Sequence, residues 1–92
     1  MIPMDHSRVD GSFASLTVPS RVESVRAAAS FLVQAAKEMQ VPLAADAVFE
    51  LAIVEALNNA VKHGNSGRSA ANIVCEMERS DHRLTVRILA TI

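Results

Sequence analysis

The stretch from Glu50 to Gly64 constrains this chain most, because it reads as one helix whose two sides carry different kinds of residue. Neighbouring residues of an α-helix are separated by about 100°, and at that spacing one side is a broad apolar stripe suited to packing on a core. The stripe consists of Phe49, Ile53, Leu57, Ala60 and Val61. The opposite side carries three polar residues that follow three apolar ones, in the order Val48, Leu51, Ala52, Glu55, Asn59 and Lys62. Such a mixed side predicts a helix that is covered on both sides or that lines a pocket with its polar end.

Two consecutive asparagines, Asn58 and Asn59, stand in the interior of this helix. Asparagine costs a helix roughly 0.6 kcal/mol relative to alanine, because its side-chain amide competes with the backbone for hydrogen bonds. Residues that oppose the local preference in this way are more often functional than accidental. The helix is therefore the candidate functional element.

The composition predicts one small domain with a hydrophobic core, since half of the 92 residues are apolar. The net charge is −1, the basic residues are scattered and the only aromatic residues are three phenylalanines, which argues against a nucleic-acid surface. The three glycines are not arranged as a phosphate-binding loop, so neither a Rossmann fingerprint nor a P-loop is present.

The sequence also predicts a cytoplasmic protein without membrane contact. A single cysteine, Cys75, forms no intrachain disulfide and fits a reducing compartment. Residues 1–10 lack the basic and apolar segments of a signal peptide, and no apolar run approaches the roughly 20 residues of a membrane helix. The three histidines share no ligand spacing, so no zinc site is expected.

Taken in order, the residues predict a flexible tail over 1–11 and then a β-α-α-β-β succession. Residues 12–18 alternate as a strand, and Ser20 with Glu23 forms a capping box at the start of a helix that ends near Gln40. The core seam of that helix is Val22, Val25, Ala29, Leu32, Ala36 and Met39. A second helix runs from about Ala44 to His63, followed by two alternating strands that contain residues 73–78 and 84–92. We expect an α+β fold with two helices on one side of a small, three-stranded sheet.

The last strand is still alternating at Ile92, and no turn residue or covering element follows it. A sheet that ends on an apolar strand exposes an edge that natural folds cover or pair. The sequence is therefore expected to be part of a larger domain or to be completed by another chain. Self-association through this open sheet edge is the expected form of the second case.

The segment Glu55 to Gly64, with the sequence EALNNAVKHG, resembles the N box of the GHKL, or Bergerat-fold, ATPases. It is most similar to the branch of bacterial anti-sigma-factor serine kinases, whose helix carries Glu-x-x-x-Asn, then a basic or aromatic residue and His-Gly. The order of the surrounding elements agrees as well. The resemblance implies that residues 12–92 form the N-terminal part of a histidine-kinase-like ATPase domain, a two-layer α/β sandwich of the Bergerat type.

The resemblance also implies a Mg-ATP site on this helix. Asn59 would be the magnesium ligand, since Mg²⁺ prefers hard oxygen donors, and Glu55 would be the general base. Lys62 and His63 would lie near the nucleotide phosphates. The residues alone leave other interpretations open, because Glu55 and Asn59 also suit a surface hydrogen-bonded pair, and Lys62 and His63 suit the negative end of the helix dipole.

The sequence departs from the family after the N box. There the family has an Asp-x-Gly-x-Gly box whose aspartate recognises the adenine amino group. Aligned with that strand, this sequence has Ala90 in place of the aspartate and Ile92 in place of the first glycine, and the later glycine-rich lid is absent. The predicted sandwich is therefore truncated before the glycine boxes, with an incomplete nucleotide site.

The function implied by the resemblance is that of a protein serine/threonine kinase. Such a protein uses Mg-ATP to phosphorylate an anti-sigma antagonist protein, and it sequesters a sigma factor. Two alternatives stay open. One is a non-catalytic protein-binding module that engages a regulator without nucleotide, and the other is an ATPase-domain fragment of a two-component sensor kinase, which shares the N-box helix.

Overall fold

The computed structural model describes residues 6–9, 11–64, 72–81 and 83–91. These residues form four strands and two α-helices, with a short 3-10 helix, η1, between the two helices. In chain order the elements are β1 (His6–Val9), β2 (Phe13–Pro19), α1 (Val22–Glu38), η1 (Pro42–Ala45), α2 (Ala47–Gly64), β3 (Asn72–Ser80) and β4 (Arg83–Thr91). Ile92, which the sequence analysis assigned to the last strand, lies outside the described residues.

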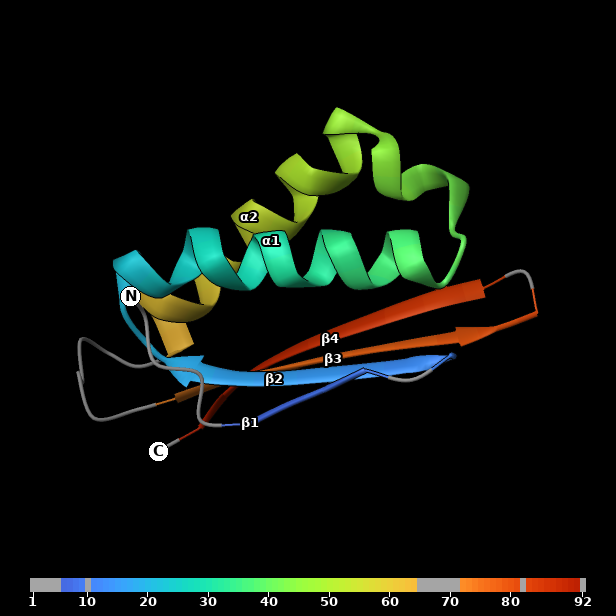
Figure 1. Ribbon diagram of the computed structural model, residues 1–92. Helices are drawn as coiled ribbons and strands as arrows, with labels where there is room; N and C mark the ends of the chain where they lie inside the picture. The colour runs from blue at the N-terminus through green and yellow to red at the C-terminus, as the bar shows by residue number, and fades with distance from the viewer. Residues whose placement is uncertain (1–5, 10, 65–71, 82, 92) are drawn as a thin grey trace.

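The strands form one antiparallel sheet in the order β1-β2-β3-β4. Leu16 of β2 lies opposite Cys75 of β3, which in turn lies opposite Ile88 of β4. Both helices cover the same face of this sheet, as Figure 1 shows. The predicted α+β fold, a two-layer sandwich of helices on a sheet, is therefore confirmed.

The core lies between the helices and the two central strands. Alternate side chains of β2 and β3 face it and are at most 1% exposed, namely Ala14, Leu16, Val18, Ile73, Cys75 and Met77. From α2, Ile53 and Leu57 point into the same core. The period-two pattern of the strands and the apolar stripe of the second helix predicted these faces, because each pattern repeats at the period of its element.

The N-terminus differs from the prediction. Residues 1–11 were expected to be a flexible tail, but His6–Val9 forms β1 and pairs antiparallel with β2. The sequence HSRV has no apolar stripe, so its pattern gave no strand signal. Pairing at a sheet edge is made by backbone groups, which need no such stripe. The sheet consequently has four strands, one more than expected.

Both helices begin later than predicted. The N-cap of α1 is Arg21 and no side chain caps this helix, so the expected capping box of Ser20 and Glu23 does not form. The second helix begins at Ala47 instead of Ala44, because the Oδ1 atom of Asp46 accepts a hydrogen bond from the backbone N–H of Val48 at 2.8 Å. Aspartate at an N-cap satisfies one of the free amide groups at a helix start, which explains this boundary.

The helices cover the sheet unevenly. Helix α1 contacts β2 and β3, whereas α2 is the helix in contact with β4. Leu84, Val86 and Ile88 of β4 pack against the core from its margin and stay only partly buried. The outer side of α2 and the edge strand β4 are therefore the open parts of the molecule, and the candidate site lies there.

Candidate functional site

The polar face of α2, defined by Glu55, Asn59, Lys62 and His63, brings the four predicted site residues together. Asn59 follows Glu55 by four residues, and Lys62 and His63 follow Asn59 by three and four, which places neighbours of the set on one side of the helix. All four are exposed, on the side opposite the buried Leu57. No hydrogen bond or ion pair with the described part of the chain engages their side chains. Their polar groups are therefore available to a ligand.

The polar face continues into an apolar one toward the start of α2. Val48 and Leu51 are 70% and 61% exposed. The sequence analysis expected this side of the helix to be covered or to line a pocket. Val48 is open within the described residues, and Leu51 lines a groove between α1 and α2.

The polar face lies at the end of the molecule where β4 ends. Figure 1 shows the C-terminal end of α2 reaching the end of the sheet at which β3 begins and β4 finishes. There Asn72 pairs with Thr91, and the Thr91 hydroxyl donates to the Asn72 carbonyl oxygen at 3.4 Å. The neighbouring Ala90 is exposed and lies opposite the core residue Ile73, so its methyl group is on the helix side of the sheet. A methyl group can neither donate nor accept a hydrogen bond.

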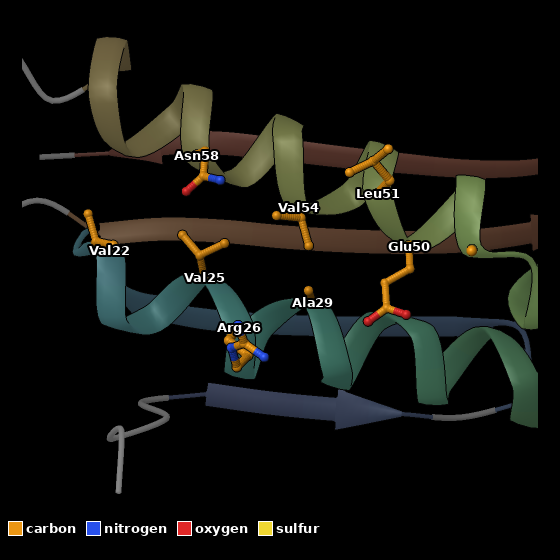
Figure 2. Close-up of a pocket in the computed structure, with 9 residues that line it drawn as sticks. Val22, Val25, Arg26, Ala29, Glu50, Leu51, Val54 and Asn58 are labelled. Carbon is orange, nitrogen blue, oxygen red and sulfur yellow. The ribbon is translucent and has the colours of Figure 1, made fainter.

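A groove of about 520 Å³ separates α1 from α2. Its walls are mainly aliphatic, with three polar side chains among them, and its lining is Val22, Val25, Arg26, Ala29, Ala47, Glu50, Leu51, Val54 and Asn58. Figure 2 shows Glu50 extending from α2 toward α1, and Asn58 at the end of the groove that Val22 closes. The two consecutive asparagines therefore lie on different surfaces, since Asn58 lines the groove and Asn59 lies on the polar face.

This groove is a feature that sequence reasoning missed. Val22 was assigned to the core seam of the first helix, but it is 70% exposed because it is the first residue of α1 and lies beyond the packed turns. The available signal was Leu51, an apolar residue off the stripe of α2, which shares the groove with Val22.

A second cavity, of about 580 Å³, lies near the β3–β4 turn and takes in Phe49 at the start of α2. Two of its lining residues, Gln40 and Asp81, have positive φ angles of 62° and 51°. Arg79, also in the lining, donates from Nη1 to the carbonyl oxygen of Met39. Neither this cavity nor the groove includes Glu55, Asn59 or Lys62, so the polar face is not part of these two hollows.

One protein family matches this chain over most of its length. The match covers residues 18–90, and the family is described as the histidine kinase-like ATPase domain. The chain belongs to this family. Comparison with curated proteins and with solved structures finds no match. The family membership confirms the resemblance to the GHKL ATPases at the level of the superfamily, and an ATPase-like family indicates a nucleotide ligand.

The residues of this histidine kinase-like ATPase domain fit one end of a magnesium nucleotide. Mg²⁺ takes one or two protein oxygen ligands beside substrate phosphates and water. Asn59 offers an exposed carbonyl oxygen, Glu55 a carboxylate one turn away, and Lys62 a positive charge on the same side. At the position that the resemblance aligns with the adenine-recognising aspartate, the side chain of Ala90 has no acceptor for an adenine amino group.

The single cysteine of the chain belongs to the core and not to the candidate site. Cys75 is wholly buried, and this burial raises the pKa of its thiol to about 11. Within the described ranges, no group of three or more His, Cys, Asp or Glu side chains is placed to hold a metal ion. None of the described helices is long and apolar enough to span a membrane.

Proposed function

We propose that this domain acts as an anti-sigma-factor-like protein serine kinase, with the polar face of α2 as the metal and phosphate end of its Mg-ATP site. The observation that carries the proposal is the grouping of Glu55, Asn59 and Lys62, all exposed on one side of a helix that lies within the family match. A solvated helix side could hold the same residues. The Glu-x-x-x-Asn spacing together with the following Lys-His-Gly favours the nucleotide site.

In this proposal each residue has a separate task. The carbonyl oxygen of Asn59 would hold the magnesium ion, and the ammonium group of Lys62, with His63 next to it, would face the phosphates. The Glu55 carboxylate accepts the proton of the attacking serine hydroxyl as general base. Bound Mg-ATP supplies the phosphoryl group and the charge neutralisation that its transfer requires.

The proposed protein partners are a sigma factor and an antagonist protein that carries the phosphorylated serine. Support for a protein-binding surface beside the site comes from the exposed Val48 and Leu51, which extend the polar face into an apolar one. Contiguous apolar residues rimmed by polar ones are typical of protein interaction sites.

Calorimetric titration of the chain with Mg-ATP tests the nucleotide site. We expect Asn59→Ala to weaken binding at least about tenfold, because it removes a hydrogen-bonding and metal-binding oxygen that interacts with charged groups. Asn58→Ala is the matched control, since it makes the same chemical change one residue earlier, on the α1–α2 groove. Equal binding by both variants would contradict the assignment of Asn59.

Base recognition gives a second, independent measurement. Because the side chain of Ala90 cannot accept a hydrogen bond from an adenine amino group, Mg-GTP should compete with Mg-ATP almost equally. A strong preference for ATP would place an adenine contact elsewhere in the chain.

The role of Glu55 is tested by Glu55→Gln. We expect this variant to bind Mg-ATP as the natural chain does, and to lose about 10²- to 10⁴-fold in nucleotide turnover, because the amide cannot accept the proton. Loss of binding instead would assign Glu55 to the ligand shell.

A second candidate function is a non-catalytic protein-binding module, and the alanine at position 90 favours it. Without an acceptor at this position, the domain could retain the helical layer and bind a regulator without nucleotide. The same titration separates the two functions, because this module would give no heat with Mg-ATP.

A further inference from the structure

The groove between α1 and α2 exposes aliphatic side chains on both of its walls. Val22 of α1 and Leu51 of α2 are 70% and 61% exposed, and Val54 of α2 is half-buried. The residues that line the groove all belong to these two helices. Burial of apolar surface is favourable, so a partner that covered these side chains would gain free energy of binding.

The polar side chains of the groove give it a direction. In Figure 2, Arg26 and Asn58 lie toward the end that Val22 closes, and Glu50 lies at the other end. Glu50 precedes Asn58 by eight residues on α2, which corresponds to about 12 Å along the helix axis. All three polar side chains are exposed, and no hydrogen bond or ion pair with the described part of the chain engages them. One end of the groove therefore offers donors with a positive charge, and the other offers a carboxylate.

These polar groups complement the two ends of an α-helix. The first turn of a helix has free N–H groups and a partial positive charge, and the last turn has free carbonyl groups and a partial negative charge. The Glu50 carboxylate can accept from such N–H groups, and the Arg26 guanidinium and the Asn58 amide can donate to such carbonyls. Because α1 and α2 run in opposite directions along the groove, their own dipoles oppose each other. The polar side chains therefore set the direction, with the N-terminus of a bound helix at Glu50.

The dimensions of the groove suit the side chains of one helix face. Over about 12 Å an α-helix makes roughly two turns and presents a row of side chains at positions i, i+4 and i+7. Packed helices have axes about 8–10 Å apart, so the backbone of a bound helix would lie above α1 and α2. Its aliphatic side chains would then enter the groove, which has a volume of about 520 Å³.

The described helices of a second copy do not offer such a row. The aliphatic residues that repeat at helical spacing in α1 and α2 pack in the core, where Leu32 and Leu57 are fully buried. On the outer side of α2, the exposed Val48 and Leu51 are followed by Glu55, so the apolar row ends there. A helix of another protein is therefore the occupant that fits.

We propose that the α1–α2 groove binds a short amphipathic helix of a partner protein, about ten residues long. Its aliphatic residues at i, i+4 and i+7 face Leu51 and Val54, its first turn lies at Glu50, and its last turn lies at Arg26 and Asn58. This inference does not rest on the proposed nucleotide site, and its test uses no nucleotide.

Two designed peptides test the direction of binding. Each is blocked at both ends and about 16 residues long, since shorter isolated helices are marginal in water, and has leucine at i, i+4 and i+7 among alanines. The Lys-first peptide has lysines in its first turn and glutamates in its last, and the Glu-first peptide has them exchanged. The dipole of the peptide itself makes the Glu-first peptide the better helix. The groove should reverse that order and bind the Lys-first peptide roughly fivefold more tightly.

Substitutions in the chain test the place of binding. The double variant Arg26→Gln and Glu50→Gln should lose the preference for the Lys-first peptide, because both charged groups are gone. Leu51→Lys places a charge in the groove and should weaken binding of that peptide at least about tenfold. Val48→Lys is the matched control, since it changes an equally exposed aliphatic residue of α2 that does not line the groove, and it should retain the natural affinity.

Fluorescence anisotropy of labelled peptides gives the dissociation constants, and circular dichroism checks that each variant is folded. A preference for the Lys-first peptide that the double variant loses supports the proposal. Absence of binding by either peptide, or a preference of the natural chain for the Glu-first peptide, overturns it. Equal weakening by Val48→Lys and Leu51→Lys also overturns it, because the peptide would then lie on the outer side of α2. Dimerisation of the chain alone that Leu51→Lys abolishes would assign the groove to a second copy instead.

Discussion

The region under α1 and the region beside α2 contain similar apolar residues but bury them to different extents. Leu16 of β2 and Met77 of β3, beneath the helical layer, are fully buried, whereas Val86 and Ile88 of β4 are half-buried. Helix α2 belongs to both regions, because its Leu57 is fully buried and its Leu51, six residues earlier, is 61% exposed. We call the region beneath α1 the closed region and the region beside α2, which includes β4, the open region.

The difference shows where stability and binding reside in a small domain. Burial of apolar surface stabilises the fold in proportion to the area removed from water, so the closed region supplies most of the stability. The open region holds the polar face of α2, the α1–α2 groove and the β4 edge, all of which can contact other molecules. Substitutions in the two regions should therefore differ in kind.

The largest expected difference is between two leucine truncations in α2. Leu57→Ala should lower the free energy of unfolding by about 3 kcal/mol, because it removes a buried side chain and leaves a cavity. Leu51→Ala makes the same chemical change on the open side and should alter it by about 0.5 kcal/mol or less. Urea unfolding followed by circular dichroism measures both. Similar values would show that the two sides of α2 are equally covered in solution.

The thiol of Cys75 reports whether water reaches the closed region. This buried thiol has a pKa raised from 9.0 to about 11, so between these pH values the unfolded chain loses this proton while the folded chain keeps it. The free energy of unfolding should therefore fall as pH rises from about 9 to 11, by about 1.4 kcal/mol per pH unit from this group.

Cys75→Ala is the control for that pH dependence, because other groups also titrate in the alkaline range. The difference in pH slope between the natural chain and this variant isolates the thiol. If the slopes agree, water reaches the thiol in the folded state and the closed region is more open than its burial indicates.

The closed region was largely predictable from the sequence, and the open region was not. Alternation in β2 and β3 and the stripe of α2 identified the buried faces, since hydrophobic periodicity records which side of an element meets the core. Strand β1 escaped prediction because backbone pairing leaves no side-chain pattern at a polar edge. Val22 was misassigned because periodicity gives the side of a helix and not how far the neighbouring elements extend.

The common helix side of the candidate residues was predictable, but the shape of the surface around them was not. The spacing of Glu55, Asn59 and Lys62 fixed their common side, and the structure agrees. Whether that side faces a pocket depends on elements far away in the sequence, which local patterns do not encode. Asn58 and Asn59 illustrate this. They are separated by about 100° around the helix axis, and Asn58 lines the α1–α2 groove whereas Asn59 lies on the polar face.

An effect of intermediate size is expected at the start of α2, a helix that belongs to both regions. Asp46→Ala removes the acceptor for the Val48 N–H and should lower the free energy of unfolding by about 1 kcal/mol. Asp46→Asn retains a side-chain oxygen and should cost less than half of that. Thermal unfolding measures both, and equal losses would mean that the hydrogen bond contributes little in solution.

The smallest expected effect concerns the ion pair on the open edge. Arg87 and Glu76 meet at 3.4 Å, but their side chains are 51% and 33% exposed. Solvent weakens the attraction, and ordering two long side chains opposes it, so the pair should contribute about 0.3 kcal/mol. A double-mutant cycle with Glu76→Gln and Arg87→Gln, at concentrations where the chain is monomeric, isolates this energy. A coupling above about 1 kcal/mol would mean that the pair is shielded from water, and β4 would then belong with the closed region.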